Sequence, residues 1–191
     1  MTIANALAMA RHLLRDRLAT AGTVVDATAG NGHDTLFLAA NSPADATVWA
    51  FDLQPEALDA TGRRLADQDL TGKCRLICDC HSRVADYLDR QVDAAMFNLG
   101  YRPGSDHRFT TGAETTVAAL GAITRLLAPG GLVTIVAYSG HDAGEEENTA
   151  VADFLATLPQ TAFTAAVWRM LNQRNRPPIL YIIGKTGSET A

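Results

Sequence analysis

The spacing of apolar residues divides the chain into a leading helix, a series of strands and helices, and a final pair of strands. Over residues 3–19 the apolar positions recur with a helical period, which predicts an amphipathic helix at the start of the chain. We place Arg11, Arg15 and Arg17 on its outer, polar face. The apolar face of this helix is then the one that packs against the rest of the domain.

Short apolar runs then alternate with helical stretches. Strands are predicted at residues 23–28, 48–51, 75–78, 93–97 and 132–137, and helices at residues 33–41, 55–68, 82–89, 113–127 and 145–157. Two final strands, residues 163–171 and 179–184, flank a polar turn and are predicted to form a hairpin. This order predicts an α/β fold, in which a seven-stranded, mostly parallel sheet carries helices on both faces and the final strand of the hairpin lies antiparallel at one edge.

Composition limits the class of protein. A chain of 191 residues with 47% hydrophobic and 19% charged residues fits a single soluble domain over residues 1–191, with a frayed tail at 186–191. Its longest apolar runs fall short of the roughly 18 residues that span a bilayer. The formal net charge of -5 argues against indiscriminate binding to nucleic acid, but it allows a local basic patch.

Three cysteines, Cys74, Cys78 and Cys80, form an odd set close to one predicted strand. They do not make a disulfide framework, so we expect a reducing cytoplasm. A Cys-x-Cys pair can bind a metal, but no second ligand pair follows it. We therefore expect buried thiols and no metal site.

A glycine-rich turn follows the first strand. Gly30 and Gly32 allow the backbone to turn tightly and to approach a ligand closely, and the helix that follows presents free N–H groups. A dinucleotide fingerprint requires a third glycine where Thr35 stands, which argues against a nicotinamide cofactor. Asp26 stands four residues before Gly30, and this spacing resembles the first motif of class I S-adenosylmethionine (SAM) methyltransferases. A tight turn that holds no ligand is the alternative. The candidate cofactor-binding residues here are Asp26, Ala29, Gly30, Asn31, Gly32, His33, Asp34 and Thr35.

Acidic residues follow the second and third strands, at the sheet edge where ligands bind in such folds. Asp52 can accept hydrogen bonds from both ribose hydroxyls, with Gln54 as a second contact; its alternative role is to cap the helix that begins at Pro55. Asp79 can accept from an adenine amino group, or it can cap the short helix beside His81, a further candidate contact.

The segment Asn98-Leu99-Gly100-Tyr101 follows the fourth strand and resembles the Asn/Asp-Pro-Pro-Tyr element of methyltransferases that act on amine or amide nitrogens. An attacking amine must hold its hydrogens away from the methyl group. The side-chain oxygen of Asn98 and the carbonyl of Leu99 can accept those hydrogens, and Gly100 allows the turn. Tyr101 can stack on a planar base, or its ring can pack against the positively charged sulfonium. Asn98, Leu99 and Gly100 are also candidate cofactor contacts.

A protonated amine must lose a proton before it attacks. Asp106, His107 and His141 are the candidate proton acceptors, and Arg108 and Tyr138 stand near them in the sequence. Structural polar roles are the alternative for each residue taken alone. Together, in loops after central strands, they favour a catalytic site whose side chains are Asn98, Tyr101, Asp106, His107 and His141.

The polar turn of the hairpin, residues 172–178, carries two arginines and no acid. We expect the sixth strand to run parallel to the others, which places this turn at the ligand edge of the sheet. A basic rim for phosphates is one interpretation, and solvated loop charge is the other. The arginines concerned are Arg102, Arg108, Arg169, Arg174 and Arg176.

Taken together, these motifs resemble a small family of SAM-dependent methyltransferases, the YtqB/MnmM type, whose members carry the label rRNA methylase. The resemblance covers nearly the whole chain and rests on residues 26–39, 51–54, 98–107, 138–147 and 172–178. It implies the Rossmann-like class I methyltransferase fold. In this family Leu more often stands in place of Arg102, and Gly in place of Ser105, so the contacts around the loop differ here.

The resemblance also implies a reaction and an assembly. The reaction is SAM-dependent methylation of the aminomethyl group on a wobble uridine in the anticodon region of tRNA, and the assembly is a homodimer. The sequence leaves open action on rRNA or on a small-molecule amine. A SAM-binding module without catalysis is disfavoured by the intact segment from Asn98 to Tyr101.

Overall fold

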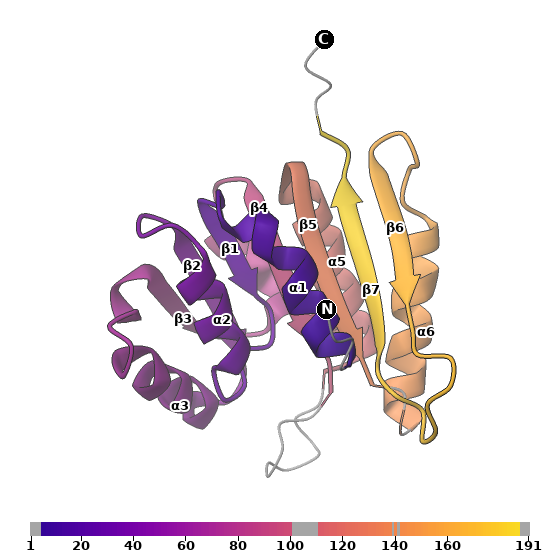
Figure 1. Cartoon of the computed structure of the whole chain (residues 1–191), viewed down its shortest axis with the longest axis horizontal. Coiled ribbons are helices and arrows are strands. Elements are labelled where there is room, and N and C mark those ends of the chain that lie inside the picture. The colour runs from indigo at the N-terminus through magenta and orange to yellow at the C-terminus, as the bar shows by residue number, and fades with distance from the viewer. Residues whose placement is uncertain (1–4, 101–110, 139, 141, 188–191) are drawn as a thin grey trace.

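The computed structural model describes residues 5–100, 111–138, 140 and 142–187. They form a seven-stranded sheet in the order β3-β2-β1-β4-β5-β7-β6 (Figure 1). The strands are β1 (Thr23–Asp26), β2 (Thr47–Asp52), β3 (Cys74–Cys78), β4 (Val92–Asn98), β5 (Leu127–Ala137), β6 (Phe163–Trp168) and β7 (Ile179–Lys185). The helices are α1 (Ala6–Leu18), α2 (His33–Asn41), α3 (Pro55–Ala66), α4 (Val84–Tyr87), α5 (Ala113–Leu126) and α6 (Asp142–Ala156), with short 3-10 turns η1 (Thr71–Lys73) and η2 (His81–Arg83).

The first five strands pair in parallel, and β7 pairs antiparallel with both β5 and β6. Because β6 reverses the direction of β7, it runs parallel to the first five, as the sequence predicts. The predicted α/β fold class, a mostly parallel seven-stranded sheet with an antiparallel C-terminal strand, is confirmed. The expected edge position of the antiparallel final strand is wrong, because β7 inserts between β5 and β6 and the edge strands are β3 and β6.

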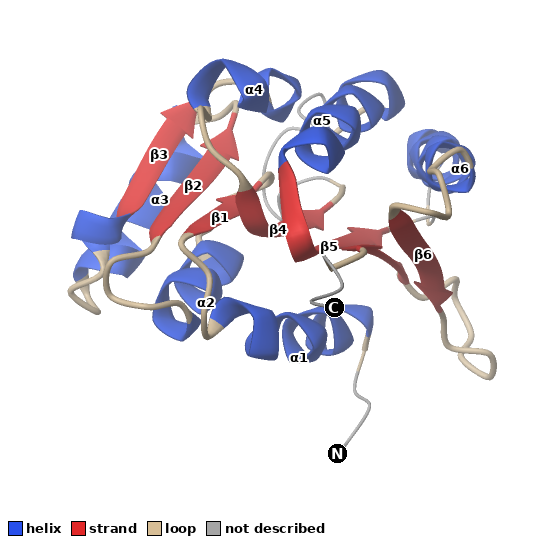
Figure 2. Ribbon diagram, turned by 90° about the horizontal axis from the view of Figure 1, so that it is seen from above, coloured by secondary structure: helices blue, strands red, loops and turns tan. Residues whose placement is uncertain are grey.

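Period-two alternation gives the sheet two separate cores. Val24 and Val25 are adjacent and both fully buried, but they point to opposite faces. Val24 joins a core with Leu14 of α1 and Leu38 of α2. Val25 joins the other core, which α5 and α6 cover (Figure 2). Strands buried on both faces explain the continuous apolar runs in the sequence.

The predicted start of β5 is wrong by five residues. The segment Pro129-Gly130-Gly131 predicts a turn between a helix and a strand, yet the strand begins before it, at Leu127. Leu127 pairs with Val92, and the register then shifts so that Leu132 pairs with Ala94. The intervening residues form an irregularity of the bulge type, where Gly130 takes a positive φ of 72°.

The expectation that all three arginines of α1 lie outside is also wrong. The Arg11 guanidinium is ion-paired with Asp34, and Arg17 is ion-paired with Asp93. The Asp93 carboxylate also accepts from the N–H groups of Gly22 and Thr23, at 2.8 and 3.0 Å. In addition to its apolar face, ion pairs therefore attach α1 to α2 through Asp34 and to β4 of the sheet through Asp93.

Within the described ranges, no helix combines the length and the apolar character that crossing a membrane requires.

Candidate active site

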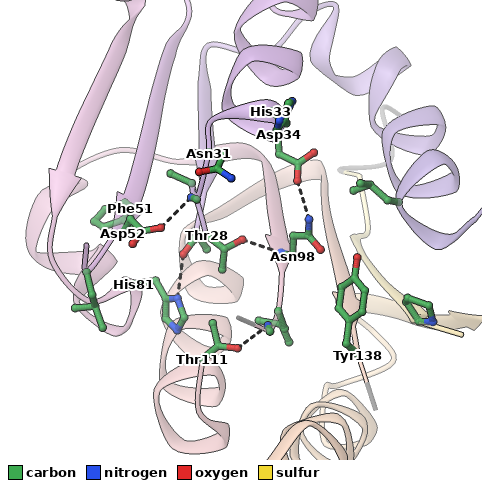
Figure 3. A pocket seen from close by; sticks show the side chains of 18 of the residues that line it. Thr28, Asn31, His33, Asp34, Phe51, Asp52, His81, Asn98, Thr111 and Tyr138 are labelled. Atoms are coloured by element: carbon green, nitrogen blue, oxygen red, sulfur yellow. Dashed lines mark hydrogen bonds between the residues drawn. The ribbon is translucent and has the colours of Figure 1, made fainter. Parts of the chain in front are cut away.

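A cavity of about 1100 Å³ opens at the carboxyl ends of the parallel strands. Its walls come from the turns after β1, β2, β3 and β4, from α1, and from the hairpin turn before β7 (Figure 3). The predicted residues that line it are Ala29, Gly30, Asn31, His33, Asp34, Asp52, Gln54, Asp79, His81, Asn98, Leu99 and Gly100. The structure thus gathers side chains from four separate turns around one space.

The glycine turn after β1 has the backbone shape that its sequence predicts. Gly30 and Gly32 have φ angles of +53° and +78°, in the region that favours glycine. A Cβ added to Gly32 would lie 2.7 Å from the Cα of Thr61 on α3. The Thr61 hydroxyl donates to the Gly30 carbonyl at 3.2 Å, and Arg64 donates to the Asn31 carbonyl at 2.8 Å. Helix α3 therefore supports the turn from behind.

Asp26 holds this turn together from inside the protein. Its carboxylate accepts from the Thr28 N–H at 3.1 Å and from the Thr35 hydroxyl at 2.6 Å. The side chain is fully buried and does not line the cavity, and neither do Gly32 and Thr35. Burial, followed by the charge of Asp34, raises the pKa of Asp26 to about 7. These three residues form the frame of the turn, behind the cavity wall.

The raised pKa of Asp26 predicts a pH-dependent stability. Because folding favours the protonated carboxyl, its contribution is full below about pH 4 and is lost as the pH rises through about 7. Asp26→Asn resembles the protonated form, so we expect the variant to gain stability relative to wild type between pH 5 and pH 8. Urea denaturation of the SAM-free proteins at both pH values measures this, with exposed Asp16→Asn on α1 as the control. A stability difference that is the same at both pH values would contradict the prediction.

Asp52 joins the first two turns. Its carboxylate accepts from the Gly30 N–H at 2.8 Å and from the Gln54 N–H at 2.9 Å. The N-cap residue of α3 is Gln54, so Asp52 does not cap that helix. Each carboxylate oxygen carries a further lone pair, which leaves capacity for ligand hydroxyls at the cavity wall.

The Asp79 carboxylate is held mainly by its own surroundings. It accepts from the Tyr87 hydroxyl at 2.7 Å, pairs with Arg83 at 2.9 Å and accepts from the Cys80 N–H. The hydrogen bond from Tyr87 is the main cause that lowers the pKa of Asp79. Its carboxylate is therefore charged at neutral pH where it reaches the cavity wall.

His81 has one ring nitrogen bonded and one without a partner. The side chain is buried, with 7% of the residue exposed, and its Nδ1 lies 3.0 Å from the Ala27 carbonyl oxygen. A carbonyl only accepts, so Nδ1 carries the hydrogen. Burial lowers the pKa of His81, which favours the neutral ring. Nε2 is then a buried acceptor with no hydrogen-bond partner among the described residues.

Asn98 ends β4 with its backbone and side chain both fixed. Its N–H donates to the Thr28 hydroxyl at 2.8 Å, and its side-chain Nδ2 donates to Asp34 at 3.0 Å (Figure 3). No described residue donates to its Oδ1. This amide oxygen is the acceptor that the sequence predicts for an amine, and Tyr138 stands beside it.

A buried carboxylate on α6 ties together the two chain positions that flank residues 101–110. The Gly100 N–H donates to the Thr111 hydroxyl at 3.0 Å, and that hydroxyl donates to Glu147 at 2.8 Å. Thr116 also donates to Glu147, at 2.6 Å. Glu147 is only 3% exposed, so it supports the site from inside. Five predicted residues, Tyr101, Arg102, Asp106, His107 and Arg108, lie outside the described part, as does His141.

The hairpin turn lies at the cavity, as predicted from the direction of β6. Residues 175–178 line it, and Arg176 pairs with Glu145 at 3.0 Å. Arg169 and Arg174 are exposed. Among the described residues, no group of three or more acidic, histidine or cysteine side chains is arranged to hold a metal ion. The three cysteines are free thiols, but only Cys74 is buried; the expectation of buried thiols is wrong for Cys78, which is exposed, and for Cys80, which is half-buried.

Sequence reasoning missed three contributors to the site. Arg11 lines the cavity from α1, Thr28 receives the Asn98 N–H, and Thr111 receives the Gly100 N–H. In the sequence, Thr28 looks like one residue of the glycine motif, and Arg11 looks like a residue on the outer surface of a helix. Only the fold reveals their second partners.

Comparison with known proteins assigns the family. A family model described as "Putative rRNA methylase" matches residues 48–184, more than half of the chain. The chain belongs to this rRNA methylase family. A chloroplastic tRNA (mnm(5)s(2)U34)-methyltransferase from Arabidopsis thaliana is 34% identical over 183 residues, which is 90% of this chain. The chain spans 66% of the length of that relative.

Solved structures of family relatives match over nearly the full chain. A structure described as a putative rRNA-methylase from Clostridium thermocellum has a TM-score of 0.93 and 41% identity, covering 97% of this chain and all of the other. A methyltransferase described as putative from Streptococcus mutans, solved in complex with SAH, has a TM-score of 0.88 and 35% identity, covering 96% of this chain and 99% of the other. The predicted family, the class I SAM-dependent methyltransferase fold and the predicted cofactor are thereby confirmed.

Proposed function

We propose that this family member methylates the aminomethyl group of a modified wobble uridine in tRNA, converting 5-aminomethyl-2-thiouridine to 5-methylaminomethyl-2-thiouridine. The observation that carries the proposal is the Asn98 amide. Its nitrogen is bonded to Asp34, and no described residue donates to its oxygen at the cavity. An acceptor in that position suits an amine, whose hydrogens must be held while the nitrogen lone pair attacks.

The cavity has the donor and acceptor set that SAM requires. The glycine turn allows close approach of a ligand, and Asp52 has spare lone pairs for ribose hydroxyls. The Nε2 of His81 is an acceptor to which no described residue donates, so it can accept a hydrogen bond from the ligand. Asp79, Gln54 and the remaining lining residues of the turns complete the proposed contacts. When bound, SAM supplies an activated methyl group on a sulfonium ion.

The chain's own task is to hold and deprotonate the amine. Asn98 Oδ1, with the Leu99 carbonyl, accepts the hydrogens of the amine and so directs its lone pair. Asp106, His107 and His141 are the proposed proton acceptors, and Tyr101 is the proposed stacking residue. Since methyl transfer is an in-line displacement, this orientation of the amine supplies much of the rate acceleration.

The hairpin turn supports an RNA substrate. Arg174 and Arg176 belong to a turn that borders the cavity, so their guanidinium groups can reach phosphates around an inserted base. The name of the Arabidopsis relative supports the wobble uridine of tRNA in particular. The family description names rRNA, and a small amine fits the negative net charge; these are the alternative substrates. We further propose a cytoplasmic homodimer.

Nucleoside analysis of tRNA tests the substrate. tRNA that carries 5-aminomethyl-2-thiouridine is incubated with the enzyme and SAM, digested, and analysed by mass spectrometry. We expect the methylaminomethyl nucleoside to appear in this tRNA. In parallel reactions with rRNA or with free amines, we expect no methylated product. Methylation of rRNA or of a free amine, without a product from tRNA, would contradict the proposal.

A further inference from the structure

Asp34 lies between the leading helix and the proposed amine acceptor. One carboxylate oxygen accepts from Nε and Nη2 of Arg11, at 3.0 and 2.6 Å. The other oxygen accepts from Asn98 Nδ2 at 3.0 Å (Figure 3). Asp34 is only 5% exposed, so its carboxylate is directed mainly at these two partners. The three side chains come from α1, α2 and the end of β4.

The chemistry of a carboxylate fixes which way the Asn98 amide faces. An ionised carboxylate only accepts hydrogen bonds, so the amide must present its nitrogen to Asp34 and its oxygen to the cavity. Without such a partner the two ends of an amide are nearly equal in size and shape, and either can face the cavity. The reversed amide would present hydrogens to an amine, which also carries hydrogens.

Arg11 fixes the carboxylate in turn. Its guanidinium donates twice to a single oxygen of Asp34, which leaves the other oxygen for Asn98. Arg11 also lies over the ring of Phe37, 5.4 Å from its centroid, which holds the guanidinium in place on α1. A nearly buried carboxylate without this cation would lose its compensating charge.

We propose that Asp34 and Arg11 are positioning residues for methyl transfer, which act by fixing the Asn98 amide with its oxygen toward the amine. This inference rests on the proposed function, in which that oxygen accepts the hydrogens of the amine. It gives the leading helix α1 a part in the reaction. It also assigns Asp34 to Arg11 and Asn98 rather than to SAM, because Asp34 is only 5% exposed and already accepts three hydrogen bonds from these two residues.

The variant Asp34→Asn reverses the pattern of hydrogen bonds. The introduced amide turns its oxygen to the Arg11 guanidinium, which only donates, and its nitrogen to Asn98. Asn98 then presents its oxygen to position 34 and its nitrogen to the cavity. We expect kcat for tRNA methylation to fall about 100-fold, the loss typical of a misplaced reacting group. We expect the Kd for SAM, measured by calorimetry, and the KM for tRNA to change less than about twofold.

The double variant gives the sharper test, because it should partly reverse the effect. Once Arg11→Met removes the donor, the amide at position 34 can turn its oxygen back to Asn98. We expect Arg11→Met with Asp34→Asn to be about tenfold more active than Asp34→Asn alone, a non-additive result. Arg15→Met is the matched control, since Arg15 also lies over Phe37, at 5.8 Å, but is not among the residues that donate to or pair with Asp34. A double variant no more active than Asp34→Asn would overturn the inference.

A measurement without substrate separates this inference from the proposed function. In SAM-free protein labelled with nitrogen-15 at asparagine, the side-chain amide signal of Asn98 is identified by its loss in Asn98→Ala. We expect slow hydrogen exchange of this amide in wild type and faster exchange in Asp34→Asn. Unchanged exchange would overturn the fixed amide, even if tRNA is methylated. If the wild-type enzyme fails on tRNA, the proposed function fails while the exchange result still stands.

A large rise in the Kd for SAM with kcat retained in Asp34→Asn would assign Asp34 to the cofactor and overturn the positioning role.

Discussion

Asn98→Ala is expected to abolish methyl transfer while SAM still binds. The substitution removes the acceptor at the cavity and the donor to Asp34, but it leaves the Asn98 N–H bonded to Thr28. The variant therefore keeps the pocket for the substrate but lacks the group that directs the lone pair of the amine. We expect kcat to fall about 1000-fold, the upper end of the loss for a group that stabilises the transition state directly.

Single-turnover methyl transfer and calorimetry with SAM measure the two halves of this prediction separately. Asn41→Ala is the matched control, because Asn41 ends α2 and donates to the Phe37 carbonyl away from the cavity. It should retain activity. Retained turnover in Asn98→Ala would remove Asn98 from the mechanism, and loss of SAM binding would assign it to the cofactor.

Gly32→Ala is expected to lose both SAM binding and stability. The added Cβ would lie 2.7 Å from the Cα and 2.8 Å from the hydroxyl of Thr61, and φ at this position is +78°. Strain at a left-handed position and overpacking against backbone together cost about 2 to 5 kcal/mol. The turn can relieve this clash only by moving away from α3, which displaces Gly30 and the bond from its N–H to Asp52.

Urea denaturation and calorimetry with SAM measure these effects. Gly72→Ala is the control, since nothing lies within 4 Å of the Cβ that it adds, and its effect on stability should be within about 1 kcal/mol. A Gly32→Ala protein with wild-type stability and SAM affinity would show that the turn tolerates a side chain and would contradict the account of this motif.

The parts that the sequence predicts well are those governed by local patterns. Alternation in β1 sends Val24 and Val25 into opposite cores, and the Gly30 and Gly32 turn has the positive φ angles that its glycines suggest. The placement of chemistry at strand ends follows from the fold class, so Asp52 and Asn98 meet at one cavity as expected.

The parts that escape sequence reasoning depend on where whole elements dock. A helical period identifies the apolar face of α1, but it does not show that Arg11 reaches Asp34 on α2. Motif spacing places Asp26 at the glycine turn, yet only the fold shows its carboxylate turned into the protein and away from the cavity. The predicted start of β5 is wrong because a Pro-Gly-Gly segment is locally typical of a turn, whereas pairing of Leu127 with Val92 extends the strand through it.

The most direct test of the central claim is a crystal structure of the enzyme with SAM and an anticodon stem-loop that carries the aminomethyl uridine. The quantity to measure is the position of the substrate nitrogen relative to Asn98 Oδ1 and to the methyl carbon of SAM. We predict that the nitrogen lies within hydrogen-bond distance of that oxygen and in line with the bond from sulfur to methyl. A complex in which Asn98 points away from the uridine, or in which the base cannot enter the cavity, would contradict the account.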